Sequence, residues 1–247
     1  MSTFETMPAS PTLVLVPGLV NTGFVWRHQQ PALAAVMPTV IAEHVPEATL
    51  AGMARSLLAR FAGPLVLAGH SMGGRIALEA CRLAPDRILG VALLDTGCKA
   101  LAAGEAGEAE VRKRRALVAL ARERGMRAML QQWILDMLHP DRYADTVLVE
   151  EVVAMMAASS ADDFSRQVEA LIARPEASDV LAGLAAPALI LCGREDRWAS
   201  PAQHAAMAHL ARTGTLVIVP ECGHMAPLER PHEVTQALRD WLAEMPH

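Results

Sequence analysis

Short apolar runs alternate along the chain with segments in which apolar residues recur at helical spacing. Runs rich in Val, Ile and Leu predict strands buried on both faces, at residues 12–17, 40–44, 65–70, 88–95, 188–193 and 215–220. Amphipathic spacing predicts helices between and after them, at 24–36, 50–61, 72–81, 201–211 and 231–245. Strands that alternate with helices of this size indicate βαβ units. The predicted fold class is therefore α/β, with a mostly parallel, doubly wound sheet.

The alternation stops after the strand that ends at Asp95. Residues 97–184 contain no strand pattern, and we expect four helices there, at 108–124, 126–138, 146–158 and 162–173. We interpret this stretch as a helical cap inserted into a core formed by residues 1–96 and 185–247. The basic run Arg112-Lys-Arg-Arg115 lies among acidic residues, so we interpret it as a solvated helix face with ion pairs inside the helix.

Composition narrows the classes of partner. The chain has 247 residues and a net charge of -5, and it shows no basic stripe, which argues against nucleic acid. No apolar segment is long enough to span a membrane, so we expect no membrane association. Four cysteines are scattered without C-x-x-C spacing, and we interpret them as buried free thiols in a reducing cytoplasm. The sequence leaves the oligomeric state open.

The motif Gly69-His-Ser-Met-Gly73 stands between a predicted strand and a predicted helix. A G-x-S-x-G sequence in this context is typical of a nucleophile elbow, a sharp turn that exposes a serine hydroxyl. Glycines two residues on either side of Ser71 fit such a turn, because a side chain there would collide where the helix folds back on the strand. Ser71 is therefore the candidate nucleophile, and a glycine-rich βα turn without chemistry is the alternative.

A serine nucleophile needs a histidine base that is oriented by a carboxylate, and α/β-hydrolases place these in the chain order Ser, acid, His. Asp196 and His224 follow the strands predicted at 188–193 and 215–220, so both fall at the carboxyl ends of strands, where an open sheet binds its ligand. Asp95 is the rival acid because it also ends a strand, and Glu195 is a lesser rival. Each residue alone could be structural, for instance Asp196 as a helix cap.

An acyl-transfer site also needs backbone donors for the oxyanion. The Met72 N–H at the helix start is one candidate. The second is expected in the loop after the first predicted strand, where Gly18 lets the backbone turn. We choose the Leu19 N–H for this role and keep Val20 as the alternative.

Together these motifs resemble the α/β-hydrolase superfamily, and specifically its compact bacterial esterase branch with a helical cap. The resemblance implies a Ser71–Asp196–His224 triad. It departs from the family at Pro17-Gly18, where His-Gly is usual. It extends over nearly the whole chain and is carried by 16–19 with Trp26, 69–74, 94–96, 193–196 and 222–231.

The predicted function is a serine hydrolase that cleaves a small carboxylic ester, lactone or thioester through an acyl-enzyme on Ser71. The alternatives are a C–C bond hydrolase with the same triad and a low-turnover small-molecule sensor or signalling protein on the hydrolase fold. The expected partner is a small acyl substrate. Residues predicted to line its pocket, with core packing as the alternative, are Val20, Met126, Met129, Trp133, Met137 and Met225.

No metal or cofactor is expected. The chain has no H-E-x-x-H motif, no Gly-rich phosphate loop and no dinucleotide fingerprint. Histidines in predicted helices lack paired ligand spacing and are expected to face solvent; these are His28, His204, His209 and His232.

Overall fold

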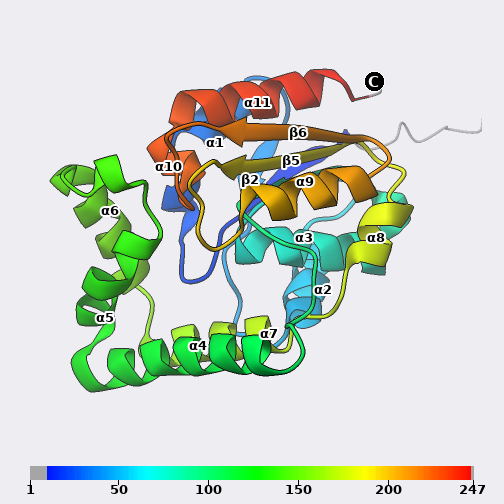
Figure 1. Ribbon diagram of the computed structural model, residues 1–247. Coiled ribbons are helices and arrows are strands. Elements are labelled where there is room, and N and C mark those ends of the chain that lie inside the picture. The colour runs from blue at the N-terminus through cyan, green and yellow to red at the C-terminus, as the bar shows by residue number, and fades with distance from the viewer. Residues whose placement is uncertain (1–9, 246–247) are drawn as a thin grey trace, which may run out of the picture.

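Six parallel strands form one sheet at the centre of the computed structural model, which describes residues 10–245 (Figure 1). Their order across the sheet is β2-β1-β3-β4-β5-β6. Because every pairing is parallel, the carboxyl ends of all six strands meet at one edge of the sheet. The strands are β1 Thr12–Val16, β2 Thr39–Ile41, β3 Leu65–His70, β4 Ile88–Leu94, β5 Ala188–Gly193 and β6 Gly214–Val219.

Helices cover both faces of the sheet, as the sequence pattern predicts for a doubly wound fold. On one face lie α1 Gln29–Ala34 and α11 Pro231–Ala243, drawn above the sheet in Figure 1. The other face carries α2 Leu50–Arg60, α3 Met72–Leu83, α8 Ser178–Gly183 and α9 Pro201–Leu210. The central strands are fully buried between the two layers, which explains why β3 and β5 are apolar without alternation.

The topology reverses direction between β1 and β3. The chain leaves β1 toward β2 at one edge and then returns to the other side of β1 to form β3. Loops that leave the carboxyl ends of strands at such a switch point diverge and open a crevice, the usual ligand site of an open α/β sheet. Ser71 directly follows β3, and Leu19 follows β1, so the switch point brings these two segments together.

The segment between β4 and β5 is helical, with α4 Glu105–Arg124, α5 Met126–Trp133, α6 Thr146–Ala157 and α7 Ala161–Ile172. These four helices stand together to one side of the sheet layers (Figure 1). Gly125 separates α4 from α5 with a φ of +84°, a conformation that glycine adopts without strain. The division of the chain into a core and a cap stays a prediction. Three of these four helices, α4, α6 and α7, agree within a few residues with the predicted ones, and α8, which also lies between β4 and β5, has no predicted counterpart.

Two predicted helices differ from the structure. The helix expected at 24–36 is a 3₁₀ turn, Gly23–Trp26, followed by α1. Pro31 accounts for the break, because inside a continuous helix its ring would clash with the carbonyl of Arg27. The helix expected at 126–138 ends at Trp133 and continues as the 3₁₀ turn Ile134–Asp136. Further 3₁₀ turns span Pro85–Arg87 and Pro140–Arg142, and α10 Ala226–Glu229 is a short helix without a predicted counterpart.

Two other features of the described residues concern the cysteines and the length of the helices. All four cysteines are buried free thiols. Between residues 10 and 245, no helix combines the length and apolar character that crossing a membrane would require.

Candidate active site

Ser71 lies on a strained turn between β3 and α3. Its φ is +53°, which is unusual for a residue with a side chain. The turn requires glycine at positions 69 and 73, because backbone atoms pass too close to leave room for a Cβ. A Cβ on Gly69 would lie 2.4 Å from the Gly73 carbonyl carbon, and a Cβ on Gly73 would lie 2.1 Å from the Val16 carbonyl oxygen. The Thr96 hydroxyl donates to the Ser71 carbonyl oxygen at 2.6 Å and holds the turn against β4.

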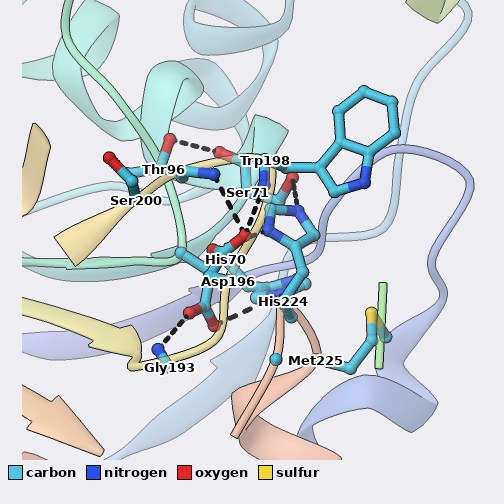
Figure 2. A network of polar contacts seen from close by, with 12 residues as sticks. His70, Ser71, Thr96, Gly193, Asp196, Trp198, Ser200, His224 and Met225 are labelled. Atoms are coloured by element: carbon cyan, nitrogen blue, oxygen red, sulfur yellow. Dashed lines mark hydrogen bonds and ion pairs between the residues drawn. The ribbon is translucent and has the colours of Figure 1, made fainter. Parts of the chain in front are cut away.

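The structure brings the side chains of Ser71, His224 and Asp196 into one hydrogen-bonded chain (Figure 2). His224 Nε2 lies 2.9 Å from Ser71 Oγ, and His224 Nδ1 lies 2.9 Å from Asp196 Oδ2. A carboxylate can only accept, so Asp196 fixes the proton on Nδ1 and leaves Nε2 free to accept the serine proton. The order and spacing are those that a serine hydroxyl needs to become a nucleophile.

Asp196 is held as a carboxylate by its surroundings. Burial alone would raise its pKa, but the His224 imidazole and the backbone N–H groups of Trp198 and Ala199 lower the pKa of Asp196 below its usual value. Asp196 Oδ1 accepts hydrogen bonds from these two N–H groups at 2.8 and 3.0 Å. Oδ1 therefore fixes the loop between β5 and α9, and Oδ2 orients the His224 imidazole.

The two rival acids are engaged elsewhere. Asp95 is fully buried, and its Oδ1 accepts the Gly193 N–H at 3.0 Å. Burial, and then the negative charge of Asp196, raise the pKa of Asp95 well above its usual value. Glu195 accepts the Cys222 N–H at 3.0 Å. Of the three candidate acids, Asp196 is the one that hydrogen-bonds to His224.

A buried glutamate shapes the loop that carries His224. Glu229 Oε1 accepts the N–H groups of Gly223 and Met225, both at 3.1 Å, so it anchors the residues on either side of His224. Its Oε2 accepts the His139 N–H at 2.7 Å and so ties the loop to the inserted segment. Burial raises the pKa of Glu229 above its usual value, although these three hydrogen bonds favour the charged form.

His70 supports the same loop from the other side. Its Nε2 lies 2.8 Å from the His224 carbonyl oxygen and must donate, so its Nδ1 is free to accept from Asn21 Nδ2 at 3.3 Å. Burial, reinforced by His224, lowers the pKa of His70 to about 3. His70 is therefore a neutral side chain that positions the His224 backbone.

The loop after β1 distinguishes between the two candidate oxyanion donors. The Val20 N–H donates to Gln167 Oε1 on α7 at 2.8 Å, so it is already occupied. The N–H groups of Leu19 and Met72 bind no other group of residues 10–245, and both residues line the cavity at Ser71. Met72 is the first residue of α3, where backbone N–H groups have no partner within the helix. The geometry therefore favours Leu19 over Val20.

A cavity of about 80 Å³ opens at the Ser71 hydroxyl. Its wall combines the strand ends with the segment between β4 and β5, which contributes Arg114, Trp133, Met137 and Leu171. Trp133 and Met137 thus lie where the sequence predicts. The other residues predicted for the pocket are buried in the core outside this wall, because helical spacing cannot distinguish a lining side chain from a packed one; these are Val20, Met126, Met129 and Met225.

One helical histidine also differs from expectation. His204 is fully buried, and its Nε2 accepts the Thr96 N–H at 3.1 Å while its Nδ1 donates to the Ser200 carbonyl oxygen at 3.1 Å. The prediction that it faces solvent is wrong, because α9 packs on β5 and turns His204 toward the loop after β4. No group of three or more His, Cys, Asp or Glu residues in 10–245 is arranged to hold a metal ion.

Comparison with known proteins identifies the family of this chain. Residues 13–237 match the Alpha/beta hydrolase family. The chain belongs to this family. The chain is 29% identical to the (E)-2-((N-methylformamido)methylene)succinate hydrolase of Acinetobacter baylyi. The match extends over 191 residues, 74% of this chain and 67% of the relative.

Two solved structures show the same alpha/beta hydrolase fold. An esterase from Thermogutta terrifontis, solved with malate bound, superposes with a TM-score of 0.84 and 24% identity, over 96% of this chain and 91% of its own. The enol-lactonase from Burkholderia xenovorans also gives a TM-score of 0.84, with 22% identity, over 97% of this chain and 94% of its own.

Proposed function

We propose that this alpha/beta hydrolase cleaves a small carboxylic ester, lactone or thioester through an acyl-enzyme on Ser71. The observation that carries the proposal is the unbroken chain from Ser71 Oγ through His224 to Asp196, with both of its links at 2.9 Å. The names of the relatives, an esterase, an enol-lactonase and a substituted-succinate hydrolase, are in keeping with attack on a carbonyl carbon.

Ser71 Oγ attacks the substrate carbonyl carbon while His224 Nε2 takes the hydroxyl proton. The carbonyl oxygen becomes an oxyanion, which the amides of Leu19 and Met72 stabilise; one such donor is typically worth ~3 kcal/mol of barrier. The tetrahedral intermediate collapses, and His224 gives its proton to the departing alcohol or thiol. The acyl group is then bonded to Ser71.

Deacylation repeats these steps with water. His224 removes a proton from a water molecule, whose oxygen attacks the acyl carbon, and the proton returns to Ser71 Oγ as the free acid leaves. Asp196 stays ionised throughout and stabilises the imidazolium that forms in each step. In this proposal residues 97–184 act as a cap that supplies the wall facing Ser71, so they select the substrate.

Burst kinetics test the proposal. With p-nitrophenyl acetate, we expect a rapid release of nitrophenol equal to the enzyme concentration, because the acyl-enzyme accumulates. Ser71→Ala should abolish both the burst and the turnover. Ser165→Ala is the matched control: it removes a hydroxyl on α7 whose one side-chain hydrogen bond within 10–245 is to the exposed side chain of Arg122. Turnover that survives in Ser71→Ala would overturn the proposal.

A further inference from the structure

Arg75 is a largely buried cation that has no anionic partner among the residues that the structure describes. It lies on α3, one helical turn after Ser71, and lines the same cavity. Its Nη1 donates to the Lys99 carbonyl oxygen at 2.9 Å, and its Nη2 packs against Gly97. No carboxylate of residues 10–245 lies within salt-bridge distance of its guanidinium. Buried charges in proteins are normally paired, so this arginine lacks a partner that the fold would be expected to supply.

Two further arginines increase the positive charge around Arg75. Arg114 on α4 and Arg174 after α7 both bind Glu110, at 2.8 and 2.7 Å. Their side chains are only 14% and 9% exposed, so solvent screens them little. Arg114 and Arg174 therefore share one carboxylate, and Arg75 has none within salt-bridge distance among residues 10–245. Burial, and then the charge of Arg174, lower the pKa of Arg75 to about 10, which leaves it protonated at neutral pH.

The charge excess faces open space beside Ser71. Arg75 and Arg114 line the cavity at Ser71 and also a larger cleft of about 750 Å³ that adjoins it. Trp198 lines both spaces, and the guanidinium of Arg114 lies 5.7 Å from its ring centroid. The cations that line the larger cleft outnumber its acids; they are Arg75, Lys99, Lys113, Arg114, Arg174 and Arg197, against Glu110 and Asp136.

We propose that Arg75, supported by Arg114, binds a carboxylate of the substrate, so that the protein acts on an ester or lactone carrying a free carboxylate. A guanidinium presents paired N–H donors that match a carboxylate, and in a partly buried site such a bond is strong. Arg75 and Ser71 line the same small cavity, so the carboxylate and the scissile carbonyl are separated by a short carbon chain. Half-esters of short dicarboxylic acids have this form.

The inference rests on the proposed hydrolase function, and paired substrates separate the two. Monoethyl glutarate carries a free carboxylate, and diethyl glutarate has the same acyl chain without it. We expect a higher kcat/KM for the monoester in the native enzyme, measured by pH-stat. Arg75→Met should lower the monoester-to-diester ratio by about 10- to 100-fold, the range for a hydrogen bond to a charged group. Arg75→Lys keeps the positive charge, so it should lower this ratio less than Arg75→Met does.

Arg82→Met is the matched control, because Arg82 lies on the same helix but pairs with Asp179 and Glu79 at 3.0 and 3.2 Å. It should leave the ratio unchanged. Binding gives a readout that needs neither turnover nor a folded Arg75 variant: calorimetry of Ser71→Ala should detect glutarate but not the uncharged glutaramide.

The outcomes separate the two claims. An equal kcat/KM for both esters together with no glutarate binding would overturn the carboxylate site and leave the hydrolase standing. Glutarate binding without hydrolysis of either ester and without a Ser71-dependent burst from p-nitrophenyl acetate would support the carboxylate site and overturn the proposed acyl-enzyme chemistry. A ratio that falls equally in Arg75→Met and Arg82→Met would assign Arg75 a purely structural role and overturn the inference.

Discussion

Two buried aspartates at the ends of neighbouring strands give opposite predictions for the same substitution. In Asp196→Asn, the amide N–H₂ or carbonyl that replaces Oδ2 no longer requires a proton on His224 Nδ1, which lies 2.9 Å away. The imidazole can then carry its proton on Nε2, where it cannot accept from Ser71. The wrong tautomer should lower kcat by roughly 10³- to 10⁴-fold, or about 4–5.5 kcal/mol of barrier.

Asp95→Asn should instead retain activity within about threefold, because asparagine keeps an acceptor for the Gly193 N–H and Asp95 makes no hydrogen bond to His224. The stability difference between the native protein and Asp95→Asn should also depend on pH. The folded-state pKa of Asp95 lies above its unfolded value, so the folded protein is favoured when Asp95 is protonated and loses that advantage as pH rises from ~4 toward the folded-state pKa. Asparagine cannot ionise, so the variant should gain stability relative to the native protein over that window.

The assay combines kcat for p-nitrophenyl acetate with urea midpoints at pH 5 and pH 8 for the native protein and both variants. We expect an active Asp95→Asn whose midpoint advantage is larger at pH 8, and a folded but nearly inactive Asp196→Asn. Severe inactivation of folded Asp95→Asn with mild loss in Asp196→Asn would assign the acid to Asp95 and refute the reasoning.

Three further substitutions test the supports of the site. Glu229→Gln replaces one accepting oxygen with a donor, so it should lower the free energy of unfolding by about 2 kcal/mol, measured by urea titration, and should also reduce kcat. An unchanged urea midpoint would contradict the role of Glu229. Gln167→Leu leaves the buried Val20 N–H without its acceptor, and should cost ~1–3 kcal/mol and slow acylation in stopped-flow; native acylation would exclude a link from α7 to the oxyanion loop. Gly73→Ala should lower Tm by about 5 °C or more because of the contact with Val16, whereas Gly183→Ala, which meets open space, should not; equal Tm values would contradict the close approach.

The sheet and its helices could be predicted largely from the sequence, because buried parallel strands and amphipathic helices leave distinct patterns. The strand starts and ends agree within a few residues, for example 88–95 against the observed Ile88–Leu94. Short elements such as α10 could not be predicted, since four residues carry no periodicity. Pro31 was the available signal for the broken helix near the start of the chain.

The site, like the fold, has parts that the sequence predicts and parts that it does not. Ser71, Asp196 and His224 could be selected because each follows a strand, and parallel strands bring their ends together. The supporting contacts could not be predicted from sequence patterns. Gln167 binds a backbone N–H that is 147 residues away in the chain, and Glu229 binds backbone N–H groups of its own loop, whose conformation no pattern shows. Arg114 belongs to the run interpreted as a solvated face, yet it is mostly buried and turned toward the cavity. Its neighbour Arg115 pairs on the surface with Glu169, so one basic run serves two environments.

The most direct test of the account is the site of labelling by a fluorophosphonate probe, mapped by tandem mass spectrometry of the native protein. The reagent is attacked by a serine whose hydroxyl is activated by a neighbouring base, and unactivated serines do not react at comparable rates. We predict one adduct per chain, on Ser71, that is lost in His224→Ala. An adduct on another residue, or a folded protein that forms none, would contradict it.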